Sequence, residues 1–243
     1  MQINKAMILA AGYGKRMLPL TEKVPKPLIT IGIKSLLERS IELLIKIGIK
    51  EIKINTHHLS AQVENFLKEK KYEISISAIY EEELLDTGGG IFNATKEFGE
   101  DPFYVLNPDT VWNRSYYEEL KILENFYLTK KSPVLLLVDK KNSHDKSFKG
   151  DFNFKANNLL KRESNNLFIF TGAQIIDRSV FYDVKMKVFS MNLIWDNLIQ
   201  KQKLFGQVSN QTFFHVNKFY FFQLFINLEI IDVKKSLITF LSK

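Results

Sequence analysis

Residues 6–19 read AMILAAGYGKRMLP, an apolar run that breaks into a short loop of small and basic residues. The run at residues 7–9 is typical of a buried strand, and Gly12 and Gly14 let the backbone after it close on a ligand. The dinucleotide fingerprint does not fit, because it needs a third glycine where Met17 stands, and the spacing of a P-loop is also absent. The stretch therefore predicts a strand followed by a tight glycine-containing turn that matches neither motif.

Two cations, Lys15 and Arg16, follow the glycines directly. Successive backbone N–H groups can form a nest that binds an anion, and adjacent cations strengthen such a site. A tight turn between a strand and a helix, common in any α/β protein, explains the same residues without a ligand. The loop alone leaves both interpretations open, so the rest of the chain has to decide.

Length and composition predict one α/β domain. The chain has 243 residues, of which 45% are hydrophobic, and no cysteine, which excludes disulfides and thiolate chemistry. The net charge of +7 comes from 34 basic against 27 acidic residues, but the lysines are scattered and accompany no nucleic-acid-binding motif. No leader or membrane span is recognisable. We expect a cytoplasmic protein that binds neither nucleic acid nor membrane.

Hydrophobic periodicity alternates along the first half of the chain. Ser35 and Glu38 have the spacing of a capping box, and Gly48 is a typical stop, which together predict a helix over 35–47. The signals that follow are a strand at 51–59, a helix from Ser60, a strand at 74–80, a glycine-rich helix start at 86–99 and a strand at 103–109. Such alternation predicts a doubly wound, mostly parallel sheet.

Ligands of such sheets bind at the carboxyl ends of the strands. Three segments whose residues could form a ligand site fall there: AAGYGKR, LLDTGGG and NPD. The second half is less regular: PVLLLVD reads as a strand, residues 144–176 read as strands and turns that form a small antiparallel extension, and residues 190–203 carry the apolar stripe of a packed helix.

Three stretches, LAAGYGKRMLPLTEKVPKPLITIG, LLDTGGGIFNA and VLNPDTVW, together resemble the sugar-phosphate nucleotidyltransferases. The resemblance covers roughly residues 4–200. Within that family, GDF at 150–152 and FTGAQI are most similar to N-acetylmuramate alpha-1-phosphate uridylyltransferases of cell-wall recycling. It implies a Rossmann-like mixed sheet of the nucleotide-diphospho-sugar transferase type, with a nucleotide-binding half at 1–130, a sugar-binding half at 131–205 and a divergent segment at 206–243.

The resemblance implies the reaction and its participants. A phosphate oxygen of a sugar 1-phosphate attacks the α-phosphorus of a nucleoside triphosphate, and pyrophosphate leaves. UTP and N-acetylmuramate 1-phosphate are the expected substrates. The alternatives are a mannose- or heptose-1-phosphate guanylyltransferase and a non-catalytic nucleotide-sugar-binding protein. The base, the sugar and the choice between monomer and homodimer stay open.

The same resemblance assigns roles to individual residues. Pro25 and Pro27 flank Lys26, and their fixed φ angles restrict the loop and hold its cation in place, which strengthens the assignment of Lys26. The implied catalytic residues are Arg16, Lys26 and Asp109. The implied nucleotide-binding residues are Ala11, Gly12, Gly14, Lys15, Thr87 and Gly88. The implied sugar-binding residues are Asn107, Asp151, Thr171 and Gly172, with Arg162 as a weaker candidate beside Asp151.

The implied metal site departs from the family pattern. Asp109 follows a strand, as a ligand of Mg²⁺ does, and matches the family's metal-binding aspartate. The family's second ligand is the aspartate of D-V-G-T-P, but aligning the shared valine places His215 there, with Asn217, Lys218 and Phe219 after it. Imidazole is a poor ligand for Mg²⁺ and a better one for Mn²⁺, so Mn²⁺ is the alternative cofactor and His215 a doubtful ligand.

Overall fold

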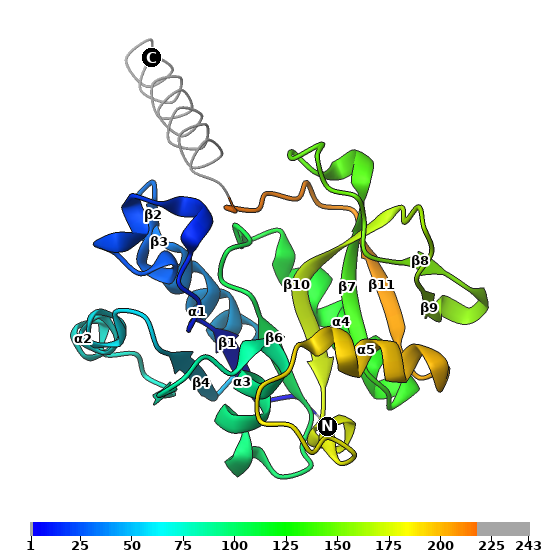
Figure 1. Ribbon diagram of the computed structural model, residues 1–243, viewed down its shortest axis with the longest axis horizontal. Helices are drawn as coiled ribbons and strands as arrows, with labels where there is room; N and C mark the ends of the chain where they lie inside the picture. Colours follow the sequence, from blue (N-terminus) through cyan, green and yellow to red (C-terminus); the bar gives the residue numbers. More distant parts are fainter. Residues whose placement is uncertain (1, 218–243) are drawn as a thin grey trace.

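A seven-stranded sheet forms the centre of the computed structural model, which describes residues 2–217 (Figure 1). Its strand order is β11-β7-β10-β6-β1-β4-β5. The strands are β1 (Lys5–Leu9), β4 (Glu51–Thr56), β5 (Ser75–Tyr80), β6 (Phe103–Leu106), β7 (Val134–Asp139), β10 (Phe168–Ile176) and β11 (Phe205–Ser209). The predictions that concern residues 218–243, Lys218 and Phe219 included, lie outside the described residues.

The pairing makes the sheet mixed and mostly parallel, as predicted. β1 pairs in parallel with β4 and β6, and β4 pairs in parallel with β5. β10 is antiparallel to both of its neighbours, β6 and β7, whereas β11 is again parallel to β7. The sheet is continuous across residue 130, the boundary drawn between the two halves.

Two small antiparallel pairs lie outside the main sheet. β2 (Thr30–Ile31) pairs with β3 (Lys34–Ser35), and β8 (Asn153–Phe154) pairs with β9 (Leu160–Lys161). The predicted antiparallel extension is therefore present as β8 and β9. The longest strand of the same region, β10, instead enters the central sheet.

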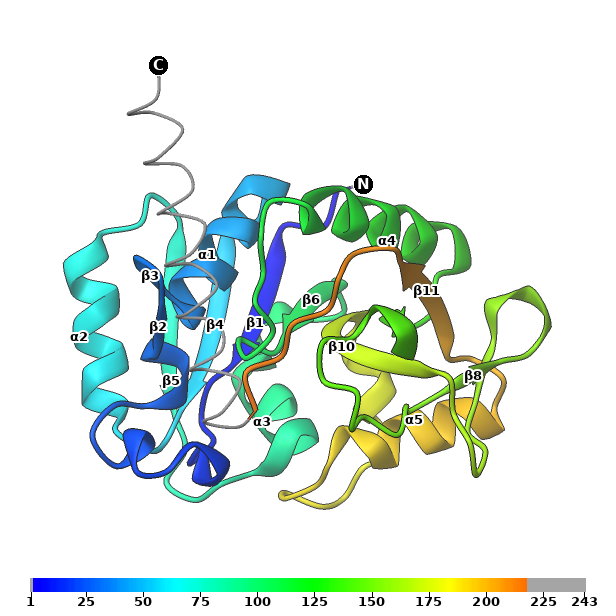
Figure 2. The same cartoon turned by 90° about the horizontal axis from the view of Figure 1, so that it is seen from above.

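Helices cover both faces of the sheet (Figure 2). They are α1 (Leu36–Ile47), α2 (Ser60–Lys70), α3 (Asp86–Ala94), α4 (Tyr116–Lys130) and α5 (Met191–Gln200). α1, α2 and α4 share one apolar cluster and α3 and α5 the other, because alternate side chains of each strand point to opposite faces. In β1, Ala6 and Ile8 enter the first cluster and Met7 the second. None of these helices of residues 2–217 is long and apolar enough to cross a membrane.

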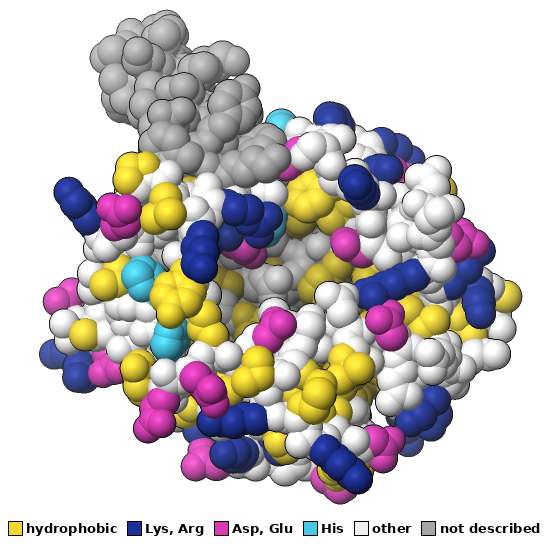
Figure 3. Space-filling view, in the orientation of Figure 1, with side chains coloured by type: hydrophobic (Ala, Val, Ile, Leu, Met, Phe, Trp, Pro, Cys, Tyr) yellow, Lys and Arg dark blue, Asp and Glu magenta, His cyan; other side chains and the backbone are white. Residues whose placement is uncertain are grey.

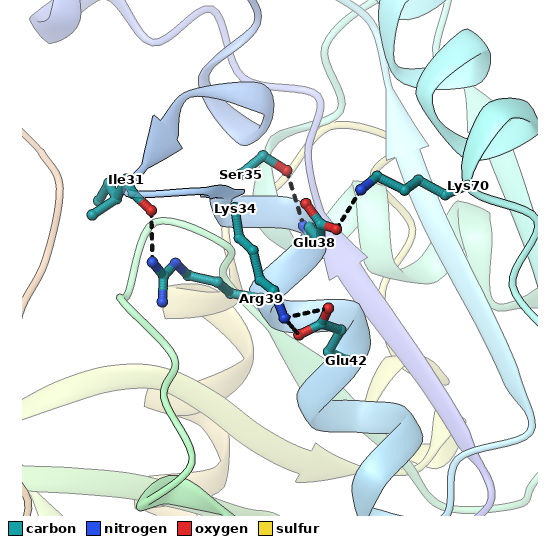
Figure 4. A network of polar contacts seen from close by, with 7 residues as sticks. All are labelled: Ile31, Lys34, Ser35, Glu38, Arg39, Glu42 and Lys70. Atoms are coloured by element: carbon teal, nitrogen blue, oxygen red, sulfur yellow. Dashed lines mark hydrogen bonds and ion pairs between the residues drawn. The ribbon is translucent and has the colours of Figure 1, made fainter.

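The first helix begins and ends as its sequence predicts, and Figure 4 shows the contacts at its start. The Ser35 hydroxyl accepts a hydrogen bond from Glu38 N at 3.1 Å, and Gly48 ends the helix at φ 103°. Only half of the predicted capping box forms, because the Glu38 carboxylate accepts from Lys70 Nζ of α2 at 2.5 Å instead. That contact joins α1 to α2.

The hairpin of β2 and β3 is fastened to α1 by polar contacts (Figure 4). Lys34 Nζ lies 2.6 Å from a Glu42 oxygen, and Arg39 donates to Ile31 O at 2.6 Å. Beneath the hairpin, a small buried cluster joins three distant segments of chain. Its members are Met17, Ile29, Ile31, Leu36, Val111 and Val216.

The three consecutive glycines of LLDTGGG lie inside α3 rather than before it. They are glycines because α3 packs against its neighbours without room for side chains at these positions. A Cβ on Gly88 would come within 2.4 Å of the Phe189 ring, and a Cβ on Gly89 within 2.4 Å of Lys187 O. A Cβ on Gly90 would lie 2.7 Å from Asn55 Nδ2. The glycine run therefore sets the close approach of α3 to the 187–189 segment.

We expect Gly89→Ala to lower the free energy of unfolding by about 1–3 kcal/mol, because its Cβ meets a backbone carbonyl that cannot rotate away. This loss exceeds the gain of about 1 kcal/mol that alanine brings to a helix. Urea titration followed by circular dichroism measures the change. Gly12→Ala is the matched control, since a Cβ there meets nothing within 4 Å. Equal midpoints for Gly89→Ala and the unchanged chain would contradict the packing argument.

Candidate active site

A cavity of about 550 Å³ opens where β1, β4, β5 and β6 end. The space-filling view shows a hollow in the middle of the molecule, with basic and histidine side chains along its rim (Figure 3). Nine of the fourteen residues to which the sequence analysis assigns a site role line the cavity: Ala11, Gly12, Gly14, Lys15, Arg16, Lys26, Thr87, Asn107 and Asp109. The parallel strands thus bring together the three segments that their sequence placed at strand ends.

The loop of residues 10–16, which we call the opening loop, exposes its backbone to the cavity. Gly14 has φ 64°, and a Cβ there would lie 2.9 Å from the Thr21 side chain and 3.1 Å from Lys26 Cβ, so only glycine fits without strain. Among the hydrogen bonds of residues 2–217, none is donated by the N–H groups of Gly12 or Gly14. These groups are therefore available to an anionic ligand.

Two exposed cations flank that backbone. Lys15 Nζ lies 5.4 Å from the centre of the Tyr13 ring, and Arg16 follows it in the first short helical turn. Within the described part of the chain neither side chain forms an ion pair with a carboxylate, although both line the cavity. Their charge is therefore available to neutralise a bound phosphate group.

Lys26 and Asp109 meet across the cavity although 83 residues separate them in the chain. Lys26 Nζ donates to Asp109 Oδ2 at 2.5 Å, and His215 Nε2 lies 3.0 Å from the same oxygen. Burial alone would raise the pKa of Asp109, but the charges and hydrogen bonds of His215 and Lys26 outweigh it and hold that pKa well below its usual range. Asp109 is therefore ionised at neutral pH.

The other carboxylate oxygen, Asp109 Oδ1, is buried and has no hydrogen-bond partner among the described residues. Mg²⁺ is usually held by one or two carboxylates together with phosphate oxygens and water. No group of three or more His, Asp or Glu side chains within residues 2–217 could hold a metal ion by itself. Asp109 therefore fits a cation that the phosphates of a ligand share.

A buried polar relay, which sequence reasoning missed, joins the ends of three strands. Asn55 Oδ1 accepts from Ala10 N at 2.8 Å, and Asn55 Nδ2 donates to Glu81 Oε1 at 2.8 Å. The second oxygen of Glu81 accepts from Leu85 N at 3.1 Å, in the turn before α3. Asn55 and Glu81 line the cavity, but each is a single polar residue at the end of a strand without a motif to mark it.

Five of the named residues do not line the cavity. Gly88 packs against Phe189, as described above, and His215 lies behind Asp109. Thr171 and Gly172 form the irregular part of β10, where the register with β7 shifts. The fifth residue, Asp151, is exposed, and its carboxylate accepts from Phe170 N at 2.8 Å.

Thr171 and Gly172 support the loop that carries Asp109. Asn107 N donates to Gly172 O at 2.8 Å, and Thr110 Oγ1 donates to Thr171 O at 2.5 Å. Gly172 has φ 93°, and a Cβ there would lie 2.8 Å from Asn107 Cβ. In this structure Thr171 and Gly172 therefore hold the loop of Asp109 in place without lining the cavity themselves.

Arg162 also lies away from the cavity and ties β9 to α5. Its guanidinium donates to Asp196 Oδ1 at 2.7 Å and to Asn192 Oδ1 at 2.6 Å. The same group lies 4.8 Å from the centre of the Phe152 ring. These contacts account for Arg162 as a structural residue.

Sequence comparison places the chain among known proteins. The family model described as "Nucleotidyl transferase" matches residues 5–148, more than half of the chain. The N-acetylmuramate alpha-1-phosphate uridylyltransferase of Caulobacter vibrioides is 25% identical over 222 residues, which cover 87% of this chain and 90% of that protein.

A second kind of relative matches a shorter stretch with higher identity. The mannose-1-phosphate guanylyltransferase catalytic subunit beta of Xenopus tropicalis is 37% identical over 121 residues, or 48% of this chain. The match spans about a third of that relative's length, 34% of it. Among solved structures, UDP-glucose pyrophosphorylase from Acinetobacter baumanii has a TM-score of 0.78 at 16% identity, covering 97% of this chain and all of that one. This last likeness shows the fold.

We expect Asn55→Ala to lower the free energy of unfolding by about 2–4 kcal/mol. It leaves the buried Ala10 N–H and one oxygen of the buried Glu81 carboxylate without their partner, and each loss costs about 1–3 kcal/mol. Urea unfolding monitored by tryptophan fluorescence measures the loss. Asn210→Ala serves as the control, because it removes the same amide from an exposed position outside the cavity. A change of less than about 0.5 kcal/mol in Asn55→Ala would refute the role of the relay.

Proposed function

The chain belongs to the nucleotidyl transferase family, and we propose that it joins a nucleoside triphosphate to a sugar 1-phosphate with release of pyrophosphate. One observation carries the proposal. The opening loop, Lys15 and Arg16, and the pair of Lys26 and Asp109 all line one cavity, and among residues 2–217 neither the two loop N–H groups nor the two cations have a hydrogen-bond partner.

The transfer needs no covalent nucleophile from the protein. A phosphate oxygen of the sugar 1-phosphate forms the new bond to the α-phosphorus, and the bond from that phosphorus to the bridging oxygen of pyrophosphate breaks. The attacking phosphate is already ionised at neutral pH, so the protein has to supply position and positive charge.

The residues of the cavity divide that task. The N–H groups of Gly12 and Gly14 orient the triphosphate, and Lys15 and Arg16 neutralise the departing pyrophosphate. Lys26 leaves Asp109 to contact the phosphate at which transfer occurs. Asp109 would hold Mg²⁺, or Mn²⁺ in its place, which would neutralise charge on the phosphates.

For the substrates, we propose UTP and N-acetylmuramate 1-phosphate, the pair used in cell-wall recycling. The uridylyltransferase match supports this choice because it covers nearly all of both chains. A guanylyltransferase acting on mannose or heptose 1-phosphate is the second candidate. It is favoured by the higher identity of the shorter match to a mannose-1-phosphate guanylyltransferase.

Pyrophosphate release from a grid of substrates tests both candidates. UTP, GTP, CTP and dTTP are each paired with N-acetylmuramate, N-acetylglucosamine, glucose or mannose 1-phosphate, in Mg²⁺ and in Mn²⁺. We expect release from UTP with N-acetylmuramate 1-phosphate. Release with GTP and mannose 1-phosphate alone would support the second candidate, and binding of nucleotide without release from any pair would support a non-catalytic binding protein.

Asp109→Asn should reduce turnover by at least about 1,000-fold while the chain stays folded with a lowered unfolding midpoint, because Lys26 loses its charged partner. The variant keeps the shape of the side chain but removes the charge that a metal ion and Lys26 both need. Asp183→Asn is the matched control, since Asp183 is exposed, lies outside the cavity and pairs with Lys201 on the surface. Full activity of Asp109→Asn would rule out the assigned role.

Arg16→Ala should weaken binding of a nucleoside triphosphate by roughly 10- to 100-fold and leave binding of the monophosphate nearly unchanged. A hydrogen bond to a charged group contributes about 1.5–3 kcal/mol, and we assign the Arg16 contact to the β- and γ-phosphates. Calorimetry with both nucleotides measures the difference. Lys23→Ala removes a nearby exposed cation outside the cavity and is the control. Equal weakening of both nucleotides in Arg16→Ala would contradict the assignment.

A further inference from the structure

Two buried side-chain oxygens of the cavity have no hydrogen-bond partner among residues 2–217. One is Asp109 Oδ1 and the other is Asn217 Oδ1, and both residues line the cavity. Only 4% of the Asn217 surface is exposed. Leaving a buried polar oxygen unpaired costs about 1–3 kcal/mol, so such atoms call for a ligand.

The last described segment runs beside the loop that carries Asp109. Val216 N donates to Asp109 O at 2.8 Å, and Val111 N donates to Phe214 O at 2.9 Å. Thr110 and His215 form an isolated antiparallel bridge between the same two stretches. Val216 is fully buried in the cluster beneath the hairpin of β2 and β3, which fixes the position of Asn217 beside it.

The His215 nitrogen that contacts Asp109, Nε2, has no lone pair for a cation. An ionised carboxylate can only accept hydrogen bonds, so the Nε2 atom that lies 3.0 Å from Asp109 Oδ2 carries a hydrogen. The other ring nitrogen, Nδ1, is buried and has no partner in the described part of the chain. The second nitrogen of a neutral imidazole keeps a lone pair, but His215 does not line the cavity in which the cation would bind.

Aromatic neighbours hold the His215 ring in this orientation. The Phe213 ring is stacked with it at a centroid distance of 5.9 Å and an angle of 11°, and the Phe148 ring lies at 5.7 Å. Both Lys26 Nζ and His215 Nε2 lie within hydrogen-bond distance of the same oxygen, Asp109 Oδ2. The free oxygen of the carboxylate, Oδ1, is the one that remains for a cation.

We propose that the divalent cation binds to Asp109 Oδ1 and Asn217 Oδ1, and that His215 is a positioning residue that holds Asp109. The inference rests on the proposed function for the identity of the anionic ligand that completes the site. A carboxylate and an amide oxygen are hard donors that suit Mg²⁺ and Mn²⁺, and phosphate oxygens and water supply the remaining ligands.

This ligand set has a consequence for the order of binding. The site contains one negative charge, where a pair of aspartates would contain two, so the protein alone attracts the cation weakly. The triphosphate supplies the missing charge. The cation therefore binds tightly only together with the nucleotide.

Binding of Mn²⁺ to the full chain, measured by electron paramagnetic resonance with and without UTP or GTP, tests the proposal without turnover. We expect Asn217→Ala to weaken Mn²⁺ binding in the presence of nucleotide by about tenfold or more. Asn217→Asp should strengthen Mn²⁺ binding without nucleotide. Asn210→Ala, the same amide loss outside the cavity, should change neither.

His215→Gln separates positioning from coordination. The Gln amide can still donate to Asp109, so we expect Mn²⁺ affinity to stay within about threefold of the unchanged chain. Electron spin echo modulation of bound Mn²⁺ should contain no ¹⁴N coupling from an imidazole. An imidazole signal, or Mn²⁺ binding that follows His215 and ignores Asn217, would overturn the proposal.

The outcomes for the cation site and for the proposed function are distinct. Mn²⁺ binding that depends on Asn217, together with no pyrophosphate release from any pair, leaves the site intact and removes the transferase assignment. Pyrophosphate release with Mn²⁺ binding that ignores Asn217 does the reverse. If Asn217→Ala shifts the unfolding midpoint, the opposite effect expected of Asn217→Asp still decides the question.

Discussion

The hydrogen bond from Ala10 N to Asn55 is the contact on which the site depends. It fixes the place where β1 ends and the backbone leaves the sheet, since β4 supplies the acceptor from the adjacent parallel strand. The same Asn55 side chain reaches Glu81 after β5, which in turn holds the turn before α3. Three loops thus begin from one buried polar relay, and the low dielectric around it makes each of its bonds expensive to lose.

Local patterns in the sequence were sufficient to predict the nucleotide-binding side of the fold. The Ser35 cap, the Gly48 stop and the alternation around β4 and β5 depend on neighbours in the chain, and all appear in the structure, although β4 ends at Thr56 and not at Leu59 as predicted. The position of β10 between β6 and β7 could not be predicted in this way, because it depends on pairing with strands far away in sequence. No prediction was made for α4, and the glycine run of α3 serves close packing that only the fold reveals.

Prediction of the candidate site had the same limit: local motifs were found from the sequence, and residues that act through long-range contacts were not. Residues within recognisable motifs, such as Gly14, Lys26 and Asp109, were found from the sequence and line one cavity. Asn55 and Glu81 line it as well but belong to no motif, and the hydrogen bond between them joins residues far apart in the sequence. Asn217 also lines the cavity and lies in a stretch that departs from the family motif. The family membership likewise rests on the motif-rich stretch up to residue 148, and the choice of base and sugar depends on contacts beyond such motifs.

The route of the last described segment affects how the protein is made. Strands β1, β4, β5 and β6 all precede residue 107, yet Val216 and Asn217 return to pack beside Met17 and Asp109. A chain emerging from the ribosome can assemble the parallel strands early, as domains do during synthesis, but the walls of the cavity stay incomplete until residue 217 has left the exit tunnel. A chain that stopped between residues 209 and 217 would therefore contain every strand of the sheet and the opening loop but would lack a finished pocket.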